Sequence, residues 1–167
     1  MPISLEELRV LRDAEAVADE IWQQVVQWDP FAKKVVGEQL ARAADSIGAN
    51  IAEAFGRFHY GEKLQFLYYA RGSLFETKYW LNRSLARDLM APDQVQAYAS
   101  RLTSVARQLN AFAGSIKAQR RGKPKRSKAV YEAPAEYIIE IEPPPLFTEV
   151  ELEWLQSVPI SNSNLNL

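Results

Sequence analysis

The sequence contains no cysteine and a single histidine, and these shortages exclude several kinds of functional site. Without cysteine the chain forms no disulfide and offers no thiol nucleophile or thiolate zinc ligand. The one histidine, His59, cannot build a His-rich metal site, and no glutamate stands three residues before it to make the Glu-x-x-His pair of a diiron bundle. The sequence also lacks a Gly-x-x-x-x-Gly-Lys phosphate loop and a serine nucleophile elbow. We therefore expect no enzyme activity, no metal and no cofactor.

Long apolar runs are missing as well. No stretch approaches the ~20 residues that a membrane-spanning helix needs, and the first residues carry neither the basic nor the apolar region of a signal peptide. At 167 residues, with 47% hydrophobic and 25% charged residues, the chain has the size and composition of one globular domain with an appendage. We expect a cytoplasmic protein that enters no membrane and takes no small-molecule substrate.

The net charge is only −1, but charges of opposite sign are segregated along the chain. Every charged residue between positions 117 and 128, the basic run, is positive: Lys117, Arg120, Arg121, Lys123, Lys125, Arg126 and Lys128. Every charged residue between 132 and 153 is negative, and most of the prolines lie after residue 120. We therefore predict a folded body over residues 1–118, then a basic linker and an acidic, Pro-rich tail over 119–167.

Both parts of the tail allow more than one interpretation. The basic run is typical of segments that bind the phosphate backbone of RNA, with a solvated linker as the alternative. The acidic tail alternates charged and apolar residues and cannot form a core alone. We expect it to mask the basic run, or to dock in a groove of its own body or of a partner.

Apolar residues recur at helical spacing in four segments of the body. The first segment ends at Asp29, which we expect to cap the next helix with Pro30 at its first position. The second and third segments run from about 31 to 58 and from about 61 to 90, and the fourth begins at Pro92. Because the connections are short, we predict an all-α, antiparallel up-down-up-down four-helix bundle with an irregular C-terminal tail.

Besides the stripe that faces the bundle core, the second and third segments each carry a second face that we expect to be buried against a neighbour. Gly48 and Gly56 lie on one such face, and glycine inside a helix costs ~1 kcal/mol unless close packing uses the missing side chain. One bundle does not supply enough neighbours for these faces, so we predict a homo-oligomer. Two cations of the third segment, Arg71 and Lys78, fall towards the core. We expect them either to extend outwards or to pair with carboxylates such as Asp45 and Glu53.

A polar stripe follows the second segment, formed by Arg42, Ser46, Asn50, Glu53 and Arg57. One interpretation is a hydrogen-bonded contact between helices or subunits. The other is a polar rim that touches RNA or a protein partner, with Arg57 among the residues that bind phosphate. The spacing of the residues does not separate the two.

Two stretches of the body carry a motif that a known family shares. They read LARAADSIGANIAEAFGR and FLYYARGSLFETKYWL. The matching positions are Gln39, Arg42, Ala43, Ser46, Ile47, Asn50, Ile51, Ala52, Glu53, Arg57, Phe66, Leu67, Ala70, Gly72, Ser73 and Glu76. In this pattern the chain resembles the four-helix-bundle proteins encoded in the intervening sequences of bacterial large-subunit ribosomal RNA genes, also labelled ribosomal protein-like. The resemblance covers roughly residues 14–118, and Ala54 stands where the family usually has glycine.

The resemblance implies a homopentamer, a barrel of five bundles, and a relation to the accessory proteins of diversity-generating retroelements. It implies RNA or ribonucleoprotein as partner and places Arg42, Ser46, Asn50, Glu53, Ser73 and Glu76 in a polar network or interface. The alternative is a protein-interaction scaffold or reverse-transcriptase accessory protein, in which the polar stripe and the acidic tail contact protein partners.

Overall fold

The computed structural model describes residues 5, 8–121 and 144–159, and every regular element in these residues is a helix. The elements are α1 (Arg9–Val25), α2 (Pro30–Ala32), the π-helical turn η1 (Lys33–Gly37), α3 (Glu38–Gly56), α4 (Tyr60–Ala86), α5 (Pro92–Arg121) and α6 (Glu149–Gln156). The predicted all-α class is therefore confirmed for this part of the chain. Among the described helices, none combines the length and the apolarity that crossing a membrane requires.

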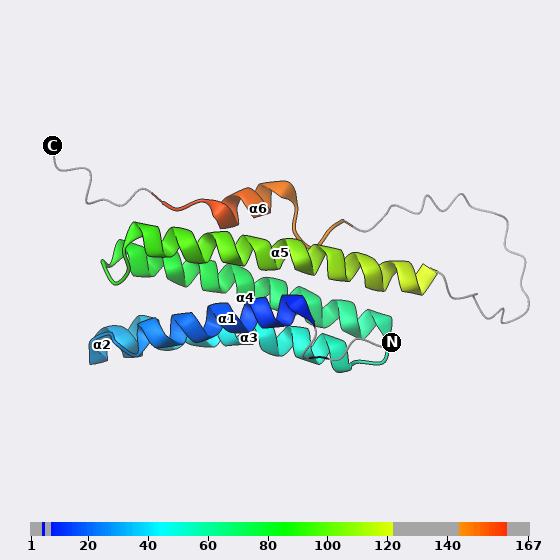
Figure 1. Ribbon diagram of the computed structural model, residues 1–167, viewed down its shortest axis with the longest axis horizontal. Helices are drawn as coiled ribbons and strands as arrows, with labels where there is room; N and C mark the ends of the chain where they lie inside the picture. The colour runs from blue at the N-terminus through cyan, green and yellow to red at the C-terminus, as the bar shows by residue number, and fades with distance from the viewer. Residues whose placement is uncertain (1–4, 6–7, 122–143, 160–167) are drawn as a thin grey trace, which may run out of the picture.

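Four long helices enclose the core. α1 and α4 each pack against both α3 and α5, and Figure 1 shows the four helices side by side along the long axis of the molecule. The apolar stripes predicted from the sequence face inwards, and residues such as Ile21, Leu40, Leu74 and Leu102 are fully buried. Each buried side chain of this size contributes about 1.5–3 kcal/mol of apolar transfer free energy, so packing rather than helix propensity holds the elements together.

The second predicted helix begins as expected and contains one irregular turn. The Asp29 carboxylate accepts hydrogen bonds from the backbone N–H groups of Phe31 and Ala32, both at 3.0 Å, and Pro30 occupies the first turn. The helix then passes through η1 before α3. At Gly37 a Cβ atom would lie 2.5 Å from Val25 Cγ1, so the close approach of this turn to the end of α1 requires glycine.

The third predicted helix ends earlier than expected, at Ala86 instead of residue 90. Asp88 has a φ of 54°, in the left-handed region that ends a helix, and the Leu89 N–H donates to the Ser84 carbonyl at 2.9 Å. The apolar periodicity predicted a longer helix because Leu89 and Met90 are apolar and still pack near the core. At these two residues, however, the backbone is no longer helical.

The C-terminal tail, predicted to be irregular, contains a helix and docks on its own body. We call residues 144–159 the C-terminal strap. Thr148 and Glu151 form a capping box at the start of α6, in which each side chain bonds the backbone N–H of the other. Leu146, Phe147, Leu152 and Leu155 are buried against the main core, and α6 lies along α5 (Figure 1). The sequence left open whether the tail docks on its own body or on a partner. The structure shows the strap docked on its own body.

Candidate nucleic-acid interface

A cation and several aromatic rings gather where α3 ends and α4 begins. Arg57 follows the last residue of α3 in extended conformation, forms an ion pair with Glu53, and places its guanidinium 4.7 Å from the centre of the Phe66 ring. Phe66 packs edge-on against Tyr69, with ring centres 5.5 Å apart. Phe58 is 86% exposed. A partly exposed guanidinium next to the exposed ring of Phe58 combines a phosphate ligand with a surface on which a base can stack.

The start of the basic run lies at the same end of the molecule as Arg57. Figure 1 shows the C-terminal ends of α3 and α5 at one end of the helix assembly, opposite α2. Lys117 lies on α5 and donates to the Pro144 carbonyl at 3.1 Å, and Arg120 and Arg121 belong to the last turn of α5. Four predicted phosphate ligands lie outside the described residues: Lys123, Lys125, Arg126 and Lys128. The chain therefore brings two separate predicted cationic elements to one end.

The polar positions of the family motif divide into three groups. Asn50 donates to the Ser46 carbonyl at 2.8 Å and to Ser73 Oγ at 3.4 Å, which links α3 to α4. The structure thus shows a helix–helix contact between Asn50 and Ser73, and Ser46 contributes its carbonyl within α3. Glu53 pairs instead with Arg57 at the end of α3.

The other two motif residues lie apart from this link. Arg42 is exposed and lines a shallow groove together with Trp22 and Asp45, and Glu76 is exposed on α4. Arg42 and Glu76 are therefore charged side chains of the motif that a partner can reach on the surface.

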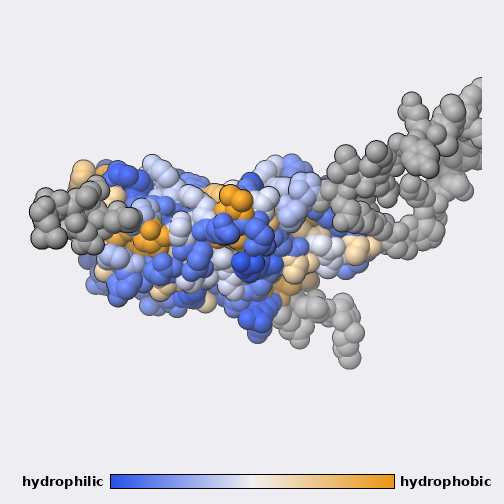
Figure 2. Space-filling model, turned by 90° about the horizontal axis from the view of Figure 1, so that it is seen from above, coloured by the Kyte–Doolittle hydropathy of each residue, from blue (hydrophilic) through white to orange (hydrophobic). Residues whose placement is uncertain are grey.

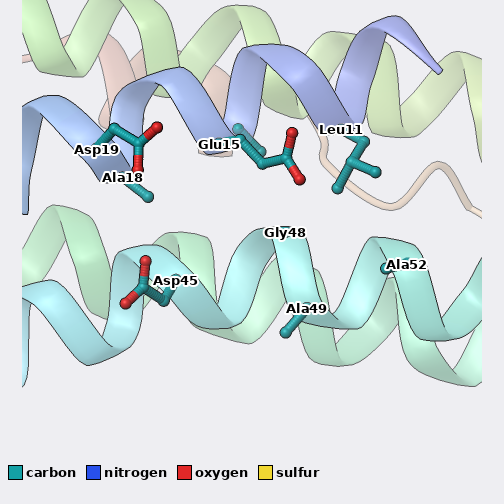
Figure 3. Close-up of a pocket in the computed structure, with 9 residues that line it drawn as sticks. Leu11, Glu15, Ala18, Asp19, Asp45, Gly48, Ala49 and Ala52 are labelled. Carbon is teal, nitrogen blue, oxygen red and sulfur yellow. The ribbon is translucent and has the colours of Figure 1, made fainter. Parts of the chain in front are cut away.

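The groove between α1 and α3 is acidic. Figure 3 shows the carboxylates of Glu15 and Asp19 on α1 and of Asp45 on α3, around the small residues Gly48 and Ala49. Burial raises the pKa of Asp45 above its usual value, and the nearby Asp19 carboxylate raises it further. The groove has a volume of about 370 Å³. Its negative charge repels phosphate, so this face is unsuited to nucleic acid.

The second faces predicted for the middle helices are only partly covered within the described chain. A Cβ atom at Gly48 would touch Leu11 and Glu15 of α1 at ordinary contact distance, whereas one at Gly56 or Gly72 would meet no described atom within 4 Å. The surface seen from the side of α6 is largely hydrophilic, with small apolar areas (Figure 2).

The carboxylate pairing predicted for Arg71 is present, but Asp45 and Glu53 were the wrong candidates for Arg71 and Lys78. Arg71 pairs with Glu151 and donates to the Leu146 carbonyl at 2.7 Å, while Lys78 donates to Asn82 Oδ1 at 2.8 Å and to the strap carbonyl of residue 157. Desolvation lowers the pKa of Lys78 to about 8. Both cations therefore bind the strap, and Lys78 is fully buried beneath it.

One sequence signal for this docking was overlooked. The Thr148-x-x-Glu151 spacing before apolar residues is a capping box and marks the start of α6. The sequence does not, however, identify the surface that α6 covers, because its contacts lie about 40 to 80 residues away along the chain.

These observations define a protein that is helical in its described residues and that has Arg57, the exposed Phe58 and the end of α5 at one end of the helix assembly. Within the described residues, no group of three or more His, Asp or Glu side chains is placed to hold a metal ion. The chain matches the 23S rRNA-intervening sequence protein family over residues 6–111, more than half of its length, and it belongs to that family. The family resemblance found in the motif is therefore confirmed. None of the curated proteins compared with the chain matches it.

Proposed function

We propose that this chain is a non-enzymatic, oligomeric four-helix bundle that binds RNA or a ribonucleoprotein in the cytoplasm. Its long helices run antiparallel in up-down-up-down order, with α2, η1 and α3 acting as one helix. The observation that carries the proposal is the placement of Arg57, its aromatic neighbours and the start of the basic run at one end of the molecule. Membership of a family named for 23S rRNA supports RNA as the ligand.

The proposed contact has an electrostatic part and a stacking part. Lysine and arginine side chains of the basic run neutralise phosphates and release counterions, which gives affinity without reading the base sequence. Phe58 offers an exposed ring face on which an unpaired base stacks, and Arg57, held over Phe66, adds charge next to it in the chain. Single-stranded segments or loops fit this combination better than a continuous duplex, in which the bases are already stacked.

Oligomerisation places several copies of the proposed RNA contact in one assembly. We favour a homopentamer, as the family resemblance implies, and the open surfaces at Gly56 and Gly72 leave room for a neighbouring copy. Several weak contacts on one RNA then add through effective concentration, so the assembly binds far more tightly than one copy.

The test measures RNA affinity against salt for full-length variants. Replacing Lys123, Lys125, Arg126 and Lys128 with glutamine removes up to four phosphate contacts. The slope of log affinity against log salt is then expected to become shallower by up to about 3 for single-stranded RNA. Truncation before the run is a poorer test, because it also removes the buried strap.

The matched control removes four positive charges at the opposite end, from Lys33, Lys34, Arg83 and Arg87. It is expected to leave the slope nearly unchanged. If both quadruple variants change the slope equally, binding is diffuse and the proposed interface is wrong.

The alternative is a protein-interaction scaffold or reverse-transcriptase accessory protein. Exposed Arg42 and Glu76 favour it, because a partner can reach both. The acidic tail favours it less, since Phe147, Leu152 and Leu155 are already buried within the chain. This alternative predicts no RNA binding near physiological salt, together with co-purification of a protein partner that is lost when Arg42 and Glu76 are replaced.

A further inference from the structure

Side chains of the body bind the main chain of the C-terminal strap near both of its ends. On α5, Asn110 donates to the Phe147 carbonyl and accepts from the Phe147 N–H, both at 2.8 Å. Near the other end, the Gln96 side chain of α5 donates to the Gln156 carbonyl at 3.1 Å. Because these hydrogen bonds are made to backbone atoms, the groove between α4 and α5 binds an extended segment followed by a helix, as peptide-binding grooves do.

Between these contacts, α4 recognises side chains of the strap. Phe75 stacks against Phe147 and Trp154, with ring centres 5.8 Å and 5.4 Å apart. Arg71 lies over the Phe75 ring at 4.8 Å and pairs with Glu151. The groove therefore combines an apolar centre with a cation placed for the acidic residue of α6, and the strap satisfies both.

The covalent connection to the strap is much longer than its docking in this chain requires. Lys117, one turn before the end of α5, already touches Pro144 at the start of the strap. Positions 122–143 nevertheless separate the two described parts. A connection of this length spans up to about 70 Å when extended, more than twice the diameter of a typical helix bundle.

We propose that the α4–α5 groove also accepts the C-terminal strap of a second copy, so that straps are exchanged between neighbours in the assembled protein. Exchange keeps every contact described above, because the occupant is chemically identical. In a separate copy the tether favours docking within the chain. When an independent interface holds copies side by side, a neighbour's groove lies within reach of the same tether at similar effective concentration. The inference rests on the oligomer of the proposed function.

Arg107 and Glu149 allow a direct test, because they face each other at 3.7 Å across the groove and both are exposed. The chain has no cysteine of its own. Full-length Arg107→Cys and Glu149→Cys chains, carrying tags of different size, are co-expressed, purified together and treated with a short bis-maleimide. Each chain has one cysteine, so a link between positions 107 and 149 can only join two copies. We expect a covalent heterodimer on a denaturing gel, and no such band from either variant alone.

Two further measurements separate the possible failures. A chain carrying both cysteines reports docking within one copy, and light scattering of the same samples reports their mass. If the protein is oligomeric and only the double-cysteine chain is linked, within itself, the exchange is overturned while the oligomer stands. If the protein remains a monomer at high concentration, the oligomer and the exchange both fail, and RNA binding remains to be judged by its salt dependence.

Discussion

Lys78 shows how one residue can connect folding to pH. It is completely buried on α4, where its ammonium group meets Asn82, the carbonyl of Ser157 and the ring of Trp154 at 5.6 Å. Burial disfavours the charged form and lowers the pKa of Lys78 to about 8, against 10.5 for the ordinary group. The folded protein thus loses this proton at a lower pH than the unfolded chain does.

We expect the stability contributed by Lys78 to rise with pH. Between pH 8 and 10.5 the unfolded chain holds the proton more tightly, so the free energy of unfolding increases through this window and is constant below it. Relative to Lys78→Met, the wild-type chain is expected to gain about 2–3 kcal/mol between pH 7 and pH 10. Urea unfolding of both chains at the two pH values measures this difference and cancels other titrating groups. If the difference in unfolding free energy between the two chains does not change with pH, the lowered pKa of Lys78 in the folded protein is contradicted.

At the scale of elements, the strap behaves as part of the core. Phe147 is almost fully buried against Phe75, and removing such a phenylalanine side chain costs about 3–5 kcal/mol. We expect Phe147→Ala to destabilise the chain by this amount in urea unfolding and to speed hydrogen exchange in α6. Val150→Ala is the matched control, since Val150 lies on the same helix and is 74% exposed. It should change stability by less than about 0.5 kcal/mol. Equal effects of the two substitutions would show that the strap is not docked.

The elements also show how far the sequence predicts the structure. The long helices were found because each buries one apolar stripe, and that stripe repeats over many turns. α6 was missed because eight residues give too few repeats, and because its stability comes from docking rather than from its own pattern. Helical periodicity was also insufficient to identify the partners of Arg71 and Lys78. Helical spacing identified them as cations that need partners, but it did not show that the strap supplies those partners.

At the scale of the whole molecule, the two ends of the helix assembly offer similar residue types in different surroundings. Phe31 is 76% exposed at the α2 end, close in sequence to Lys33 and Lys34, and Phe58 is 86% exposed at the opposite end. Composition alone does not choose between them. The end with Phe58 also has Arg57 held over Phe66 and the C-terminus of α5, from which the basic run continues.

If RNA binds at that end, the two phenylalanines differ in their effect on affinity. Stacking of a base on an aromatic side chain contributes about 1–3 kcal/mol, so Phe58→Ala is expected to weaken binding of a single-stranded RNA about 5- to 150-fold. No charge is removed, and the salt slope should therefore stay that of the wild-type chain. Phe31→Ala, a similar loss of exposed aromatic surface, should leave the affinity unchanged. Fluorescence anisotropy of a labelled RNA titrated with each full-length chain measures both quantities. Equal losses from the two substitutions would place RNA along the whole molecule, and a loss from Phe31→Ala alone would move the interface to the α2 end.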